Sequence, residues 1–305
     1  MSSTRFLAKV VPSEQDDPMP LGPTWTIGDV TVTSIIELDQ HWRFAWLLPD
    51  VTDELIDEIG WLKPHFVDPD TGKLILRIQA LVIESEGQRI VVDTCVGNEK
   101  DRPTPLFDKL NTTFMDDMVA AGFAPDSINQ VVCTHLHVDH VGWNTTLVDG
   151  QWVPTFPNAD YLFGRVEYEH WTANDQPDIY GEVMVDSVAP IVAAGLSKLV
   201  DDDHQLTSEI SVEATHGHTP GHNSIRINSG GQTAVITGDM IHHPVQFPKP
   251  DLSSSADTDS AEAIATRRSS FARWEADKTL VIGTHFAGPG AGHLKADGDG
   301  WNFVT

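Results

Sequence analysis

The sequence predicts an α/β fold in which two β-sheets pack face to face and helices cover their outer faces. Two observations support this prediction. Strand-like runs followed by helix-like runs occur in both halves of the 305-residue chain, and several strand-like runs end at a histidine or an aspartate. A hydrophobic content of 40% also provides enough apolar side chains for the core of one large domain.

The first half begins with a polar, proline-rich stretch, residues 1–24, which we expect to form an arm on the surface or on a neighbouring subunit. A single domain is expected at residues 25–305. Strands are predicted in WTIGDVTVTSIIELD and LILRIQALVIESEGQRIVVD, where two apolar runs around Glu-Gly-Gln indicate a hairpin. A helix is predicted in LFDKLNTTFMDDMVAAGF, ending at Gly122, because one face carries Leu106, Leu110, Phe114 and Met118.

The second half repeats this order. A buried strand is predicted at INQVVCTH, a strand followed by a helix at ADYLFGRVEYEHW, and a helix at VDSVAPIVAAGLSKL. Further strands are predicted at ISVEATH, HNSIRINS, TAVITGD and TLVIGTH, with a helix at AEAIATRRSSFARWEAD before the last of them. Residues 40–50 and 244–260 show neither a strand-like nor a helix-like pattern of apolar residues, and we expect them to form lids or pocket walls.

The charge of the chain restricts its partners. The formal net charge is -26, from 45 acidic residues against 19 Lys and Arg. Such a surface repels phosphate backbones and anionic lipids. We therefore expect neither nucleic acid nor a membrane as a partner, and a small molecule as the substrate.

The cysteines and the N-terminus bear on the location of the protein in the cell. Cys95 and Cys133 lie in apolar strand-like runs and are expected to be buried free thiols. The N-terminus lacks the apolar segment of a secretory signal, and the sequence contains no run of about 18 apolar residues. A cytoplasmic location is therefore predicted.

The stretch VVCTHLHVDHVGWN contains three histidines and an aspartate within six positions. His135 and His137 follow directly on a predicted strand, and their alternate spacing directs both side chains towards one point. Asp139 and His140 come next. Imidazole nitrogen and carboxylate oxygen together suit a cation such as zinc. This cluster therefore predicts a metal site at the end of the strand.

Three later motifs carry the same kinds of ligand. THGHTPGHN contains His218 and His222, VITGDM places Asp239 at the end of an apolar strand, and VIGTHF does the same with His285. In strand–helix units the strand ends meet at one edge of the sheets. These side chains are therefore expected to join the first cluster.

Together the motifs resemble the signature of the metallo-β-lactamase superfamily, HxHxDH followed by separate His, Asp and His motifs, over about residues 25–295. The resemblance implies a four-layer αβ/βα sandwich with a dinuclear metal site at one edge. It implies that one metal is bound by His135, His137 and His218, that the other is bound by Asp139, His140 and His285, and that Asp239 bridges both. Asp93 and His222 are expected to support these ligands by hydrogen bonds.

The segments DTCVGN, HVGWNT and THFAGPGAGHL resemble the branch that contains methyl parathion hydrolase and quorum-quenching lactonases. This resemblance implies a hydrolase of a small neutral ester or lactone, acting by attack of a metal-bridging hydroxide, with Asp139 passing a proton to the leaving group. A phosphotriesterase or hydrolytic dehalogenase acting on an aryl substrate, and a non-enzymatic metal-binding protein, are the alternatives. Zinc is the expected metal, with manganese, cobalt and iron left open, and a homodimer is expected.

Aromatic side chains near the motifs are candidates for the walls of a substrate pocket. The predicted wall residues are Trp42, Trp46, Trp143, Phe286 and His293. His242 and His243 follow Asp239 closely, and we expect an exposed pair rather than part of the pocket. Arg267 and Arg268 are expected to be surface or ion-paired groups.

Overall fold

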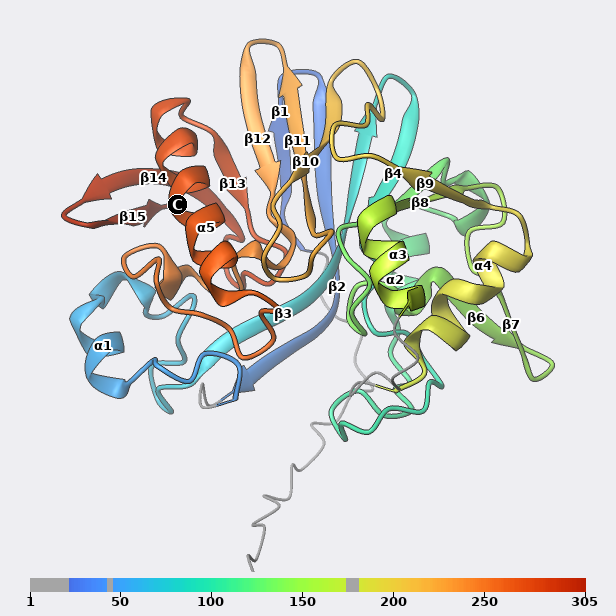
Figure 1. The fold of residues 1–305 in the computed structure, drawn as a ribbon, viewed down its shortest axis with the longest axis horizontal. Coiled ribbons are helices and arrows are strands. Elements are labelled where there is room, and N and C mark those ends of the chain that lie inside the picture. The colour runs from blue at the N-terminus through green and yellow to red at the C-terminus, as the bar shows by residue number, and fades with distance from the viewer. Residues whose placement is uncertain (1–21, 43–45, 174–180) are drawn as a thin grey trace, which may run out of the picture.

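The computed structural model describes residues 22–42, 46–173 and 181–305, without the side chain of Trp42. Within these residues, a seven-stranded sheet and a six-stranded sheet pack face to face, and helices cover the outer face of each (Figure 1). Most of the predicted N-terminal arm, residues 1–21, falls outside this description, and the first strand begins at Thr24.

The first sheet runs from antiparallel hairpins at one end to parallel strands at the other. Its hairpin turns at Gly28 and at Glu86-Gly87 adopt left-handed backbone conformations, which tight two-residue turns require. The strands, in spatial order, are β1 (Thr24–Ile27), β2 (Val30–Trp42), β3 (Leu74–Ser85), β4 (Gln88–Val92), β5 (Gln130–Cys133), β8 (Asp160–Gly164) and β9 (Ser197–Val200).

The second sheet is antiparallel except for one parallel pair, β12 with β13. Its strands, in spatial order, are β10 (Ile210–Ala214), β11 (Asn223–Ser229), β12 (Gln232–Ile236), β13 (Leu280–Ile282), β14 (Ala291–Asp297) and β15 (Gly300–Val304). Parallel neighbours need a crossover connection. Here α5 (Ser260–Ala276) provides it, and Asp259 caps its N-terminus by accepting the N–H of Glu262 with its side chain.

Helices on the other side of the molecule connect the parallel strands of the first sheet (Figure 1). They are α2 (Phe114–Ala120), α3 (Arg165–Ala173) and α4 (Ala189–Ala193), with a π-helical turn at Met184–Val188 and the small hairpin of β6 (Thr145–Val148) and β7 (Gln151–Pro154). The described residues also form the short α1 (Asp53–Glu58) and 3-10 turns at Gly60–Leu62, Pro125–Ser127, Gly142–Asn144, Gly238–Met240 and Pro244–Gln246.

Three clusters of buried apolar side chains hold these layers together. One lies between the sheets and combines residues such as Ile83 of the first with Ile225 of the second. Another packs α2 against the first sheet through Phe114, and the third packs α5 against the second through Trp274. The order helix, sheet, sheet, helix confirms the predicted αβ/βα fold.

Some predicted elements differ from the observed ones. The helix predicted at 106–122 is helical only over Phe114–Ala120, and the left-handed backbone conformation of Lys109 interrupts the predicted first turns. The helix predicted at 185–199 stops at Ala193, and Gly195, also left-handed, leads into β9. The hairpin of β14 and β15 was not predicted.

Two smaller predictions concern the cysteines and the membrane. Cys95 and Cys133 are buried free thiols, as predicted. Among the helices that the structure describes, none has the length and apolar character needed to cross a bilayer.

Candidate metal centre

The candidate ligands project from the ends of strands that belong to both sheets. The loop after β5 carries the cluster from His135 to His140, the turn after β10 carries His218, and Asp239 and His285 follow the parallel strands β12 and β13. Gly142 lets the first loop turn back closely, since a Cβ atom there would lie 1.8 Å from the carbonyl oxygen of Val96. All the predicted ligands are therefore brought to one edge between the sheets.

Three histidines form one half of the centre. Nδ1 of His137 lies 3.0 Å from Nε2 of His135 and 3.0 Å from Nε2 of His218. Oδ2 of Asp239 lies 3.9 Å from Nε2 of His135 and 3.6 Å from Nε2 of His218. Three nitrogens and one oxygen thus converge on one point, which is the geometry of a cation site.

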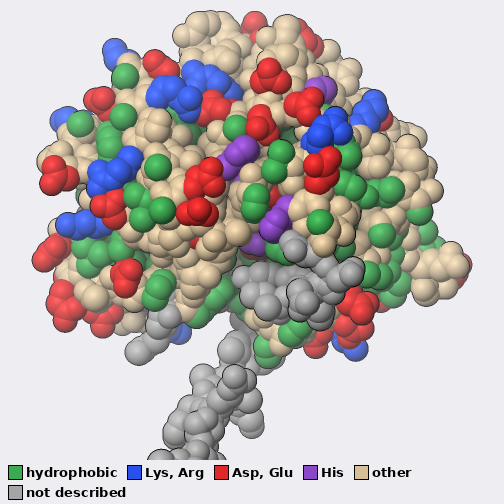
Figure 2. Space-filling view, viewed as in Figure 1, with side chains coloured by type: hydrophobic (Ala, Val, Ile, Leu, Met, Phe, Trp, Pro, Cys, Tyr) green, Lys and Arg blue, Asp and Glu red, His purple; other side chains and the backbone are tan. Residues whose placement is uncertain are grey.

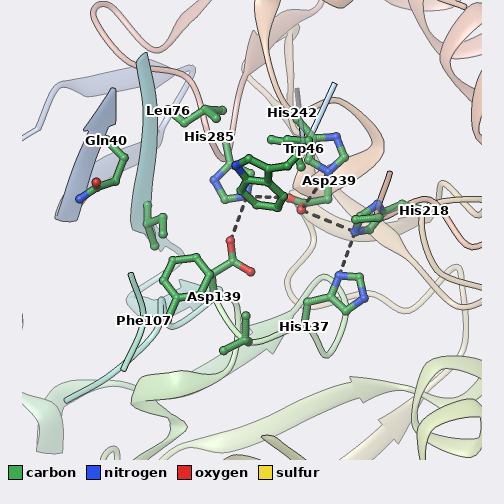
Figure 3. A pocket seen from close by; sticks show the side chains of 14 residues that line it. Gln40, Trp46, Leu76, Phe107, His137, Asp139, His218, Asp239, His242 and His285 are labelled. Atoms are coloured by element: carbon green, nitrogen blue, oxygen red, sulfur yellow. Dashed lines mark hydrogen bonds and ion pairs between the residues drawn. The ribbon is translucent and has the colours of Figure 1, made fainter. Parts of the chain in front are cut away.

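The other half uses the second oxygen of the same aspartate. Oδ1 of Asp239 lies 2.9 Å from Nε2 of His285 and 3.3 Å from Nε2 of His140. The carboxylate of Asp139 lies 3.6 Å from each of these two nitrogens. Asp239 therefore stands between two donor sets and turns one oxygen to each, as Figure 3 shows for its contacts with His218 and His285.

The donor atoms fit divalent cations. Nε2 of His140 and Oδ1 of Asp239 are buried, and within the described residues they lie against each other and against other candidate ligands without a well-formed hydrogen bond. Buried polar atoms are rarely left in this state. Burial also lowers the pKa of His135 and His137 well below the usual range, so both imidazoles are neutral and present lone pairs. Neutral imidazole and carboxylate are the forms that bind metals.

The centre also attracts positive charge. Burial alone would lower the pKa of His140, but Asp239, Asp139 and Asp93 together raise it well above its usual range. Burial likewise opposes ionisation of Asp239, yet His140, His285 and His242 hold its pKa well below the usual value. Without a metal, the negative charge of the aspartates therefore keeps neighbouring histidines such as His140 protonated. A bound cation would take the place of those protons.

Each of four ligand histidines is oriented by a hydrogen bond from its remote nitrogen. Such outer partners fix the ring and leave the other nitrogen's lone pair towards the metal. The Nδ1 partners are Thr134 Oγ1 for His135 at 3.1 Å, Asp93 Oδ2 for His140 at 2.9 Å, Asp257 Oδ1 for His218 at 3.1 Å and the carbonyl of Arg77 for His285 at 2.8 Å.

Asp93 and His222 lie behind the ligands. Asp93 accepts hydrogen bonds from the backbone N–H and hydroxyl of Thr134 as well as from His140. The backbone N–H of Asp239 donates to Nε2 of His222 over 2.8 Å. Gly238 makes this contact feasible, because a Cβ atom there would lie 2.5 Å from the same nitrogen. Both side chains are placed to support ligands, which is the role that we infer for them.

Two neighbours of the centre were not predicted as site residues. Asp257 is buried between His218 and Arg267, whose guanidinium lies 3.5 Å away. His242, expected to be exposed, is buried, and its Nε2 lies 3.3 Å from Oδ2 of Asp239. The 3-10 turn Gly238–Met240 returns the chain to the centre after Asp239. The spacing of three residues from Asp239 was the signal that could have indicated His242.

A pocket opens beside the centre, and its walls are largely apolar (Figure 3). The two segments predicted as lids contribute Trp46 and Ala256 to it, and they touch, since the backbone N–H of Ser255 donates to the carbonyl of Leu47 over 2.9 Å. Figure 2 shows histidine side chains near the middle of one face, with acidic side chains beside them. The lining comprises Gln40, Trp46, Leu47, Leu76, Ile78, Phe107, His137, Val138, Asp139, His218, Asp239, His242, Ala256 and His285.

Of the five predicted wall residues, the structure places Trp46 in the pocket, with 47% of its surface exposed. The side chain of Trp42 lies outside the described residues. Trp143 is buried against Phe114, and Phe286 belongs to the core of the second sheet, because both loops turn inward after the ligands. His293 lies on β14, where its Nδ1 bonds to the carbonyl of Thr279. These three residues are not among those that line the pocket, whereas Phe107, which was not predicted, is.

Comparisons with known proteins agree with this geometry. The family model of the metallo-beta-lactamase superfamily matches residues 76–285. An N-acyl homoserine lactonase of Bacillus thuringiensis is 25% identical over 181 residues, which cover 54% of this chain and 64% of that protein. The N-acyl homoserine lactonase AttM of Rhizobium radiobacter is 30% identical over 126 residues, covering 40% and 44%. The matches therefore span less than two thirds of these relatives.

Two solved structures are similar over nearly the whole chain. The hydrolase AbOPH of the beta lactamase superfamily has a TM-score of 0.77 and 25% identity, covering 93% of this chain and 96% of that one. AidC, described as a dizinc quorum-quenching lactonase, has a TM-score of 0.72 and 22% identity, covering 93% and 97%. At 22% identity, the similarity to AidC shows a shared fold only.

Proposed function

Since the chain belongs to the metallo-beta-lactamase superfamily, we propose that it is a dinuclear metal-dependent hydrolase of a small neutral lactone or ester. The observation that carries this proposal is the pair of donor sets that share Asp239 beside a largely apolar pocket. The similarity to N-acyl homoserine lactonases supports the lactone as the first substrate to test.

The residues of the centre divide into two metal positions and one proton carrier. One position would be held by His135, His137 and His218 and the other by Asp139, His140 and His285. Asp239, which has one oxygen near each set, would belong to both. When bound, the two cations supply Lewis acidity for the carbonyl and bring the pKa of a water to about 7. Asp139 lines the pocket, and we propose that its carboxylate passes a proton to the leaving oxygen.

The pocket walls favour a neutral substrate with an apolar part. Apolar side chains such as Leu76 and Phe107 line the pocket together with Gln40 and the histidines. No lysine or arginine contributes to the lining formed by the described residues, so no basic side chain among them would pair with an anionic group. Apolar walls with a few polar groups are typical of sites for small molecules.

His242 is the candidate for holding the substrate's oxygen. Its ring is buried beside the pocket: Nδ1 has no hydrogen-bond partner within the described chain, and Nε2 lies 3.3 Å from Oδ2 of Asp239. We expect His242→Phe, which keeps a ring but removes the donor, to lower kcat/KM by about 10²-fold. Metal content should stay unchanged. Steady-state kinetics on a lactone with metal analysis tests this, and His216→Phe, a partly exposed ring that pairs with Asp202, is the control. Unaltered kinetics in His242→Phe would exclude the role.

The proposed function is tested by initial rates on an acyl lactone, a 4-nitrophenyl ester, a phosphotriester and a cephalosporin. We expect kcat/KM above about 10⁴ M⁻¹s⁻¹ on the lactone or the ester. Chelation should abolish this activity, and added zinc should restore it. The reason is that the proposed reaction needs cations bound by the donor atoms of the centre. Rates that survive complete removal of metal would contradict the proposal, and a preference for the phosphotriester would change the bond class.

We also propose zinc as the resident metal, a homodimer as the assembly and the cytoplasm as the location. Histidine nitrogen and carboxylate oxygen support zinc. Metal analysis of the purified protein and light scattering test the first two.

A further inference from the structure

We propose that Glu167 is a positioning residue that couples the two loops holding the three-histidine half of the metal centre. This inference rests on the proposed function. Glu167 lies in α3, is fully buried and is not one of the candidate ligands. Its carboxylate instead accepts hydrogen bonds from the backbones on which two of those ligands are mounted.

The two backbone contacts come from different loops. Oε1 of Glu167 accepts the N–H of Leu136 over 3.1 Å, and Leu136 stands between the ligands His135 and His137. Oε2 accepts the N–H of Gly221 over 3.1 Å, in the turn that follows His218. One side chain therefore connects the loop after β5 with the turn after β10.

A third contact reaches a ligand ring. Nε1 of Trp171, one turn further along α3, donates to Oε1 of Glu167 over 2.7 Å. The indole in turn lies edge-on to the imidazole of His137, with ring centroids 5.4 Å apart and an angle of 70°. Glu167 thus determines both the backbone before His137 and the side chain that packs against it.

The turn after β10 also rests directly on the helix. A Cβ atom at Gly221 would lie 2.2 Å from the backbone nitrogen of Glu167, so only glycine permits this approach. Burying a carboxylate is costly unless hydrogen bonds compensate it. Here all three donors to the Glu167 carboxylate belong to groups around the three-histidine position. A change at Glu167 should therefore alter metal binding at that position.

The geometry of that position depends on the spacing of the two loops. Nδ1 of His137 and Nε2 of His218 are 3.0 Å apart although they come from the two loops that Glu167 joins. A metal site tolerates deviations of only about 0.2 Å in its ligand distances. Loss of the connection should therefore weaken this position, while the Asp139, His140 and His285 position has no hydrogen bond to Glu167 among the described contacts.

The test is stepwise metal affinity in Glu167→Gln, measured by competition with a chromophoric chelator and by the visible spectrum of the cobalt(II)-loaded protein. The amide keeps the size of the carboxylate, but its NH₂ group faces an N–H donor. We expect one of the two metal equivalents to bind 10- to 100-fold more weakly, roughly the effect of outer-shell changes, with an altered cobalt spectrum. Glu169→Gln, exposed on the same helix, is the matched control.

The outcomes separate a positioning role from a general structural one. If Glu167→Gln binds both equivalents as tightly as Glu169→Gln does, the inference is overturned. It is also overturned if both affinities fall by the same factor, since that would indicate a weakened fold. Glu167→Asp, which keeps the charge, should recover part of the lost affinity and serves as the second variant if the amide does not fold. No substrate enters these measurements, so failure of the proposed function on lactones and esters would be seen separately.

Discussion

Replacing Asp239 by Asn is expected to remove both metal equivalents and to lower kcat/KM on the preferred substrate by about 10⁴-fold or more. The reason is that Asp239 is the one side chain of the described centre that turns an oxygen to each donor set. Asparagine keeps a single oxygen and no charge. Its NH₂ group would face imidazole nitrogens that lie 2.9 to 3.9 Å from the carboxylate.

A comparison with His135→Ala sharpens this prediction. His135 belongs to the three-histidine set, so its loss should weaken one equivalent and leave Asp139, His140 and His285 in place. Metal content after desalting, measured beside kcat/KM and circular dichroism, distinguishes the two variants. Asp251→Asn, at an exposed ion pair, is the control for changing an aspartate elsewhere. Two tightly bound metals in Asp239→Asn would refute the bridging role.

The metal ligands could be predicted because each lies at a strand end that the sequence marks clearly. His135, Asp239 and His285 follow short apolar runs, and the αβ/βα arrangement brings such strand ends to a single edge. The layers themselves followed from the order of strand-like and helix-like runs. Both are local patterns, and local patterns survive folding when the hydrophobic periodicity agrees with them.

The pocket could not be predicted in the same way. Trp143 and Phe286 are close to ligands in the sequence, but packing directs both into the core. His242 reaches the pocket through a single 3-10 turn, which no periodicity indicates. Glu167 reads as an ordinary helical glutamate, and its burial depends on two loops that come from distant parts of the chain. Walls and supports of the site therefore depend on tertiary contacts.

Glu37 is a further residue whose role the strand pattern conceals. It occupies a register shift of β2, where Ile36 pairs with Gln79 and Leu38 with Ile78, so it is the extra residue of a β-bulge. Bulges redirect side chains. The buried carboxylate accepts hydrogen bonds from the backbone N–H groups of Val96 and Gly97, from the Trp143 indole and from the Thr112 hydroxyl.

This carboxylate makes a prediction about stability and pH. Burial raises the pKa of Glu37 to about 7 from 4.5, against the four donors that lower it. Between pH 4.5 and about 7, Glu37 is therefore protonated in the folded protein and ionised in the unfolded chain. Its contribution to stability is complete below pH 4.5 and is lost as the pH rises through 7. The total is about 3 kcal/mol, a large part of a typical unfolding free energy.

Glu37→Gln removes this titration and should flatten the pH dependence. We expect the free energy of unfolding of the natural protein, relative to the variant, to fall by about 3 kcal/mol between pH 4.5 and 8. Urea denaturation of both proteins in one metal buffer at each pH measures this difference, and contributions of the metal centre cancel because both proteins share it. Lys100 and Cys95 are the titratable neighbours that also sense Glu37, and both remain in the variant. Glu86→Gln, at an exposed turn, is the matched control. A difference that stays constant across this range would show that Glu37 remains ionised in the folded protein, with its four donors outweighing burial.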